Sequence, residues 1–127
     1  MKYWIKALNA LRDSDRTFSA IYSVVFSFNE NVFFEWSAEG RIRSMTYREC
    51  QSLVEAGAKR IFDALPDVSP NRFVALALEN SPSWVIAFWS ILMAGFRPLL
   101  VNTRLGHEQN AKLLDMAGVA AVVSDRP

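Results

Sequence analysis

Residues 72–84 decide the fold, and they read Arg72-Phe73-Val74-Ala75-Leu76-Ala77-Leu78-Glu79-Asn80-Ser81-Pro82-Ser83-Trp84. The run from Arg72 to Leu78 is almost continuously apolar, which is typical of a strand in a parallel sheet that is covered on both faces. Ser81 and Pro82 then open a helix, because serine caps helix N-termini and proline favours the first helical position. A buried strand that leads directly into a helix indicates an α/β protein.

The helix that follows Pro82 is apolar all round, so it must be covered on most of its sides. Its large apolar residues are Trp84, Val85, Ile86, Phe88, Trp89, Ile91, Leu92 and Met93. We expect Gly95 to close it in the left-handed conformation. Ser90 interrupts the apolar stretch, which spans about half a bilayer, so we interpret it as a core helix and expect no transmembrane segment.

Downstream of Gly95 the same alternation continues. Residues 98–102 form an apolar run that predicts a second buried strand, and residues 108–117 are typical of an amphipathic helix ended by Gly118. Residues 119–123 predict a third strand. The order strand, helix, strand, helix, strand indicates a parallel sheet with right-handed crossovers. The predicted fold class is therefore α/β, a partial three-layer βαβαβ sheet.

Another helix precedes this unit. Thr46-Tyr47-Arg48-Glu49 has the pattern of a capping box, in which Thr46 caps the helix and Glu49 reaches back. Residues at helical spacing then mark one apolar face, and Pro66 ends the helix. The members of this face are Cys50, Leu53, Val54, Gly57, Ala58, Ile61 and Leu65.

The first 45 residues are less regular. Leu8 and Leu11 have helical spacing until residues 13–15 break the pattern. Residues 17–28 suit either a helix or a strand, and their length favours a helix. Residues 32–36 and 42–45 flank a polar loop at 37–40, which predicts a β-hairpin. The sequence thus divides into N-terminal helices and a hairpin (1–45) and a helix plus βαβαβ unit (46–127), together one compact domain or a fragment.

Composition excludes several classes of protein. The chain has 127 residues, 51% hydrophobic and 21% charged, which suits a packed core, and its formal net charge of +1 gives no support for nucleic-acid binding. The single cysteine, Cys50, excludes an internal disulfide and fits the reducing cytosol, so we expect a cytoplasmic protein. The first six residues lack a secretory signal. The single histidine, His107, excludes a histidine-based metal cluster.

The sequence predicts no catalytic residue. A serine triad needs a histidine base, and we expect His107 to be an exposed residue in the first turn of a helix. Cys50 lies on the predicted buried helix face, and Asp115 and Asp125 follow separate elements with nothing to pair them. We therefore assign no catalytic, cofactor-binding or metal-binding residue.

A doubly wound sheet would bind a nucleotide at the carboxyl ends of its strands. Leu78 is followed by Glu79-Asn80-Ser81-Pro82, which has no glycine and carries a carboxylate that repels phosphate, and no GxxxxGK[ST] loop is present. Three aromatic residues, Trp84, Phe88 and Trp89, could line an acyl pocket, but we favour core packing for them.

Five motifs between Thr46 and Asp125 resemble, in order and spacing, the adenylate-forming (AMP-binding) acyl-CoA synthetase family. They are residues 46–50, 73–84, 91–98, 102–105 and 122–125. Two turns depart from the family pattern: Asn71 stands where aspartate is frequent and the nearby glycine is missing, and Gly106 opens a helix. These departures concern turn geometry only.

The resemblance implies a two-step reaction. A carboxylate attacks the α-phosphate of ATP to give an acyl-adenylate, and a thiol, commonly that of coenzyme A, then displaces AMP. ATP, Mg²⁺ and coenzyme A are implied for the full-length enzyme and none for this chain, because the family's phosphate loop, magnesium acid and catalytic lysine lie further along than residue 127. No catalytic residue is carried over.

We therefore expect an N-terminal fragment of an AMP-dependent acid–CoA ligase that is catalytically incompetent alone. Its expected partners are the remainder of the ligase and, through exposed apolar surface, a second copy of itself. One alternative is a stand-alone, non-catalytic interaction module that retains the ligase scaffold. A further alternative is a nucleotide-binding α/β domain.

Overall fold

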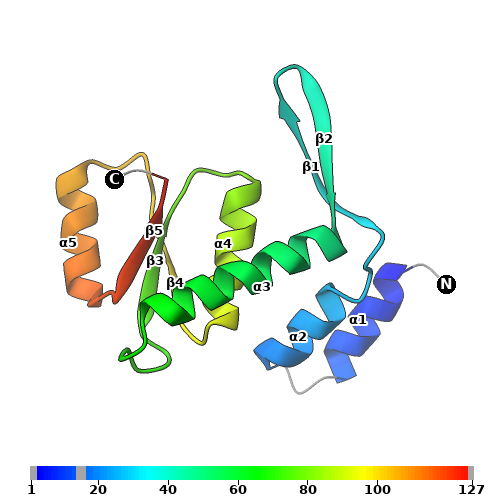
Figure 1. Cartoon of the computed structure of the whole chain (residues 1–127), viewed down its shortest axis with the longest axis horizontal. Helices are drawn as coiled ribbons and strands as arrows, with labels where there is room; N and C mark the ends of the chain where they lie inside the picture. Colours follow the sequence, from blue (N-terminus) through cyan, green and yellow to red (C-terminus); the bar gives the residue numbers. More distant parts are fainter. Residues whose placement is uncertain (1–2, 14–16, 126–127) are drawn as a thin grey trace. The chain divides into compact units, whose positions relative to one another are not determined.

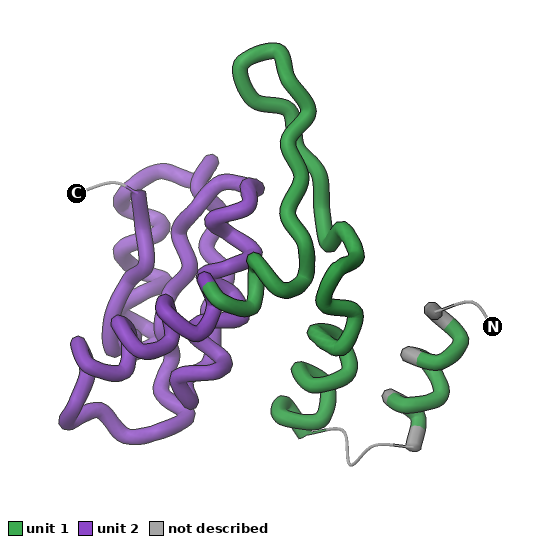
Figure 2. Tube along the Cα trace, turned by 45° about the vertical axis from the view of Figure 1, so that its right-hand side comes forward, with its two compact units in different colours: residues 1–52 green, residues 53–127 purple. Residues whose placement is uncertain are grey.

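The computed structural model describes residues 3–13 and 17–125, with the path of the chain shown in Figure 1. The chain divides into two compact units, residues 1–52 and residues 53–127 (Figure 2). Helix α3 (Tyr47–Ala64) begins in the first unit and continues into the second. Among the described helices, none combines the length and the apolar character that crossing a membrane requires.

The first unit opens with two helices, α1 (Tyr3–Asp13) and α2 (Phe18–Val25). The helix favoured for residues 17–28 is thus confirmed, with Thr17 as its cap: the Ala20 N–H donates to Thr17 Oγ1 at 3.2 Å. It is shorter than expected, because the chain turns after Val25. The predicted break at residues 14 and 15 and the side chain of Leu11 lie outside the described residues.

The predicted hairpin is formed by β1 (Val32–Ala38) and β2 (Arg41–Thr46), paired antiparallel. The expected loop at 37–40 was too long, since Ala38 already pairs with Arg41. Glu39 and Gly40 alone make the turn, with φ of 53° and 73°. Two left-handed residues in sequence match the twist of the flanking strands, which is why so tight a turn suffices.

Aromatic side chains form the interior of this unit. Phe26 is 3% exposed, and its ring stacks on Phe33 with centroids 5.8 Å apart. Phe33 meets the ring of Tyr47 edge-on at 4.4 Å. Tyr47 is the first residue of α3, so the aromatic cluster joins the start of this helix to the hairpin.

The capping box at the start of α3 is confirmed. The Thr46 N–H donates to Glu49 Oε2 at 2.9 Å, and the Glu49 N–H donates to Thr46 Oγ1 at 3.2 Å. Cys50 and Val54 are fully buried, as the apolar face predicts, but Leu53 is 45% exposed. The buried stripe repeats every four residues from Cys50, so Leu53 falls at its border.

The second unit contains a parallel sheet of three strands in the order β4-β3-β5. The strands are β3 (Phe73–Ala77), β4 (Arg97–Leu100) and β5 (Ala121–Ser124), and the helices between them are α4 (Pro82–Met93) and α5 (His107–Ala117). The predicted fold class is confirmed. The two crossovers lead from the central region to opposite sides of β3, because β4 and β5 flank it, and α4 and α5 lie on opposite faces of the sheet (Figure 1).

The core of this unit lies on the α4 face of the sheet. Its buried members are Val74, Leu76, Ala87, Ile91 and Phe96. Both predicted helix-ending glycines have positive φ, 92° at Gly95 and 61° at Gly118. The Ser81 cap is also confirmed, since its hydroxyl accepts the Trp84 N–H at 3.3 Å.

The two outer strands are less buried than expected. Leu100 in β4 is 55% exposed and Val122 in β5 is 46% exposed, whereas Val74 to Leu76 in β3 are fully buried. Within residues 17–125, only β3 of this sheet has a strand on each side. The expectation that residues 98–102 form a buried strand was therefore wrong for β4. The reason is the order of the strands in the sheet, which composition does not reveal.

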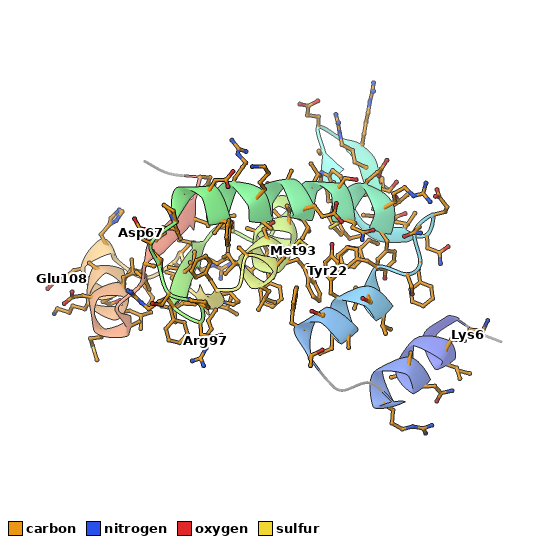
Figure 3. All side chains as sticks on the ribbon, turned by 60° about the horizontal axis from the view of Figure 1, so that its bottom comes forward. Lys6, Tyr22, Asp67, Met93, Arg97 and Glu108 are labelled. Carbon is orange, nitrogen blue, oxygen red and sulfur yellow. The ribbon has the colours of Figure 1, made fainter. Side chains whose placement is uncertain are left out.

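The boundaries of β4 and β5 also differ from the predicted ones, residues 98–102 and 119–123. β4 begins at Arg97, labelled in Figure 3, whose N–H donates to Arg72 O. The Arg97 guanidinium lies 5.7 Å from the Phe73 ring centroid. β5 begins at Ala121, because the Val119 N–H is bonded to Leu114 O and so belongs to the end of α5.

Candidate functional site

The carboxyl ends of the three parallel strands meet at one edge of the sheet, and two clefts open there. The α5 cleft has a volume of about 550 Å³ and lies between α5 and the adjoining sheet face. It is lined by Ala77, Val101, Thr103, Leu105, His107, Asn110, Ala111, Leu114, Val122 and Ser124. Most of these residues are apolar, so the cleft suits an apolar group with a few hydrogen bonds at its rim.

The second cleft, here the Glu79 cleft, has a volume of about 730 Å³. It lies where β3 and β4 end and α4 begins, and it is lined by Leu78, Glu79, Asn80, Trp84, Leu100, Val101, Asn102, Thr103 and Arg104. The carboxylate of Glu79 and the guanidinium of Arg104 place opposite charges on the wall of this cleft. This is a polar cleft without a strong preference for anions.

Two asparagines, Asn102 and Asn110, stabilise the loop of residues 102–105, which contributes to both clefts. Asn102 Oδ1 accepts the Arg104 N–H at 3.0 Å, while Asn110 Nδ2 donates to Asn102 O at 3.2 Å and to Leu105 O at 3.4 Å. Asn110 Oδ1 is buried and accepts no hydrogen bond within residues 3–13 and 17–125. Sequence reasoning missed Asn110; its low helix propensity in the first turns of α5 was the available signal.

Comparison with known proteins identifies the family of this fold. The sequence model described as AMP-binding enzyme matches residues 24–127, most of the chain. The chain belongs to the AMP-binding enzyme family. The resemblance carried by the five motifs is thereby confirmed, and the match also extends upstream of Thr46 into the hairpin and the end of α2.

Solved structures share the fold of this chain. Klebsiella oxytoca NpsA in complex with 3-hydroxyanthranilyl-AMSN has a TM-score of 0.71 at 21% identity and covers 86% of this chain. The NpsA N-terminal subdomain in complex with anthranilyl-AMSN has a TM-score of 0.58 at 26% identity and covers 67%. The nonribosomal peptide synthetase FmoA3, bound to AMPPNP, has a TM-score of 0.58 at 24% identity and covers 63%.

The matched region is a minor part of these relatives. This chain spans 21% of the NpsA chain, 22% of its N-terminal subdomain and 8% of FmoA3. A search of curated proteins gives no significant match.

The residues that sequence reasoning singled out are dispersed over this AMP-binding fold. His107 is the first residue of α5, exposed as expected, and lines the α5 cleft. Asp115 and Asp125 are exposed, one in α5 and the other just after β5. Nowhere among the described residues do three His, Cys, Asp or Glu side chains gather as a metal site would require.

Cys50 is fully buried and free. Burial raises the pKa of the Cys50 thiol to about 11, because desolvation disfavours the thiolate. The nucleophilic form of a cysteine is the thiolate, so this thiol is inert at neutral pH. The interpretation of Cys50 as a small core residue is consistent with both observations.

The aromatic residues of α4 stack on each other. Trp84 and Phe88 lie nearly parallel, with centroids 5.4 Å apart and an interplanar angle of 6°, and both pack against the core cluster. Phe88 also meets Trp89 edge-on at 5.7 Å. These contacts agree with the favoured packing role, although Trp84 additionally lines the Glu79 cleft.

The described residues do not fit ATP and Mg²⁺. The loop after β3 holds Glu79 and no glycine, and the described part of the chain gathers no set of metal ligands. Phosphate binding requires close approach of backbone N–H groups and a positive charge. In the Glu79 cleft the positive charge comes from Arg104, and the carboxylate of Glu79 in the same wall opposes it. We therefore derive no reaction step from these clefts.

Proposed function

We propose that this chain forms the first part of the N-terminal domain of an enzyme that activates a carboxylic acid with ATP. The observation that carries the proposal is the match of the AMP-binding family model to residues 24–127, together with the share of 21% that the chain occupies in NpsA. In this role the chain supplies a scaffold: a parallel sheet whose carboxyl edge faces the rest of the enzyme.

The proposed reaction has two steps. The substrate carboxylate attacks the α-phosphate of ATP, forming an acyl-adenylate and releasing pyrophosphate. A thiol then attacks the acyl carbon and releases AMP. Cations and oriented backbone donors stabilise such phosphoryl transition states. The clefts of this chain offer one cation, Arg104, beside the carboxylate of Glu79, and no glycine-rich phosphate loop, so we propose that the remainder of the enzyme binds ATP and Mg²⁺ and that this chain alone is inactive.

We propose coenzyme A as the acyl acceptor. A specific observation favours a second candidate, the thiol of a carrier domain: one matched structure is NpsA-ThdA, described as an artificially fused adenylation–PCP di-domain, at 25% identity over 66% of this chain. Both acceptors present a thiol to the same acyl-adenylate, so the choice does not alter the first step. We place the enzyme in the cytoplasm, which the single cysteine supports.

The test uses the protein expressed from its complete reading frame. Exchange of labelled pyrophosphate into ATP is measured with a panel of aromatic and aliphatic carboxylic acids, and acid-dependent exchange is expected with at least one. Thioester formation is then followed with coenzyme A and with a carrier domain, which decides between the two acceptors. A folded protein that exchanges no pyrophosphate with any acid contradicts the proposal.

A further inference from the structure

The Glu79 cleft lies where the connections of the sheet change direction. β3 leads from its carboxyl end into α4, and its neighbour β4 leads from its carboxyl end into α5. Because α4 and α5 lie on opposite faces of the sheet (Figure 1), the two loops diverge and leave a crevice between the strand ends. In open α/β sheets, ligands bind in the crevice at such a switch point. The topology therefore favours the Glu79 cleft as a ligand site.

Hydrogen bonds hold the loops on both sides of this cleft. On the β3 side, Glu79 lies between the last strand residue, Ala77, and Ser81, whose hydroxyl caps α4. On the β4 side, the Asn102 side chain accepts the Arg104 N–H at 3.0 Å. The two charged residues thus lie on backbone that is already held in place, as expected of a preformed binding site.

The lining of the cleft combines two opposite charges with an apolar wall. Glu79 and Arg104 are exposed, and one or the other repels any ligand that is purely anionic or purely cationic. Leu100 is 55% exposed, and the half-buried Trp84 lines the same cleft with its ring stacked on Phe88. A ligand that matches this lining carries an ammonium group, a carboxylate and an apolar body.

We propose that the Glu79 cleft binds a small zwitterion with an apolar side chain. The Arg104 guanidinium pairs with the carboxylate of the ligand, because the planar fork of arginine matches a carboxylate. The Glu79 carboxylate pairs with the ammonium group, and Leu100 and Trp84 contact the apolar side chain. The inference goes beyond the proposed enzymatic function and does not depend on it, because this binding requires no ATP.

A continuation of the sheet beyond β5 is not expected to fill this cleft. Leu100 pairs with Leu76, a core residue on the α4 face, so the cleft lies on that face. A further parallel strand beyond β5 would continue the step from β4 to β5, and right-handed crossovers in one direction share one face. Its connecting helix would therefore lie on the α5 face, away from the Glu79 cleft.

Calorimetric titration with L-phenylalanine tests the proposal, and two analogues that each lack one charge are the controls. Phenethylamine has no carboxylate and hydrocinnamate has no ammonium group, so both are expected to bind about fivefold more weakly than L-phenylalanine. The titrations contain no ATP, so failure of the proposed reaction does not affect them. Absence of saturable L-phenylalanine binding at millimolar concentration overturns the proposal, and so does equal binding of the three compounds.

Variants that remove one charge give a crossed measurement. Glu79→Gln is expected to bind L-phenylalanine about fivefold more weakly but hydrocinnamate more tightly than the parent chain, because it no longer repels a carboxylate. Arg104→Gln is expected to show the same reversal with phenethylamine. Glu55→Gln and Arg60→Gln, both exposed on α3, are the matched controls and are expected to change no affinity.

Circular dichroism establishes that each variant is folded, and the analogue series on the parent chain decides the matter if one is not. Folded Glu79→Gln and Arg104→Gln variants with the affinities of the parent chain overturn the proposal. The protein expressed from its complete reading frame is titrated in parallel and is expected to bind the three compounds in the same order. Binding by the isolated chain but not by the complete protein shows that other residues cover the cleft, and it also overturns the proposal.

Discussion

Gly57 on α3 lies so close to Ser90 on α4 that a Cβ at Gly57 would be 2.4 Å from Ser90 Oγ. The hydroxyl is fixed in place, because its single proton is shared between two carbonyl acceptors, Ile86 O at 2.7 Å and Val54 O at 3.2 Å. The missing side chain of Gly57 is thus what permits the two helices to approach, and Ser90 links them with a hydrogen bond between helices.

Gly57→Ala is expected to lower the free energy of unfolding by about 1 to 3 kcal/mol, the usual cost of overpacking a core. Urea unfolding followed by circular dichroism measures it. Gly106→Ser is the matched control: it also adds a Cβ, but no atom lies within 4 Å of that position and its φ of −63° is ordinary. A stability loss at Gly57 no larger than at Gly106 contradicts the close contact.

The cost of Gly57→Ala depends on Ser90. In a Ser90→Ala background, the nearest atom to a Cβ at position 57 is the Cβ of residue 90, 3.1 Å away. Gly57→Ala is therefore expected to lower the free energy of unfolding by less than it does in the parent chain. Ser90→Ala alone is expected to cost about 1 kcal/mol for its lost hydrogen bonds. A double-mutant cycle measures the coupling, and strict additivity would show that the two residues do not interact.

The Cys50 thiol is expected to stay unreactive while the chain is folded. With a pKa of about 11 instead of its ordinary 9.0, it is mainly protonated at pH 8. Labelling by a thiol reagent at pH 8 should therefore require unfolding and accelerate with urea. Rapid labelling of the folded chain in buffer would contradict the burial of this side chain.

The same pKa shift predicts a pH dependence of stability. Between pH 9 and pH 11 the unfolded chain loses the Cys50 proton while the folded chain retains it. Stability therefore falls as pH rises through this window, by up to about 1.4 kcal/mol per pH unit. Cys50→Ala serves as the control, because it removes the thiol and leaves the rest of the chain unchanged. If the free energy of unfolding falls equally steeply with pH in the parent chain and in Cys50→Ala, the prediction is wrong.

The hairpin turn offers a local test. Gly40 has a φ of 73°, which costs a residue with a Cβ about 1 to 2 kcal/mol, so Gly40→Ala is expected to destabilise the hairpin. Glu39→Asn should stabilise it instead, because asparagine followed by glycine is the preferred pair for this turn. The Trp36 indole resonance on β1 monitors both variants. The reverse order of stabilities would exclude the two-residue turn.

Local signals predicted much of the fold. The Thr46 and Ser81 caps and the glycines at 95 and 118 act through their immediate neighbours, and the structure has each as expected. Exposure was harder to predict. Leu100 and Val123 both pair with Leu76, yet periodicity along each strand cannot reveal that both strands are outermost.

The candidate site depended more on tertiary structure. The clefts arise where three strand ends converge, and Asn110 acquires its role only because the loop at 102–105 folds back onto α5. The contact of Gly57 with Ser90 joins residues that no sequence motif connects. The assignment of the family, in contrast, followed from motif order alone, because five short matches in sequence constrain one another.

The most direct test of the central claim is ATP-dependent thioester formation by the isolated chain, supplied with Mg²⁺, coenzyme A and a mixture of carboxylic acids. A scaffold without a phosphate-binding loop is expected to form no thioester and to release no pyrophosphate. Thioester formed at a rate proportional to the concentration of this chain would contradict the account.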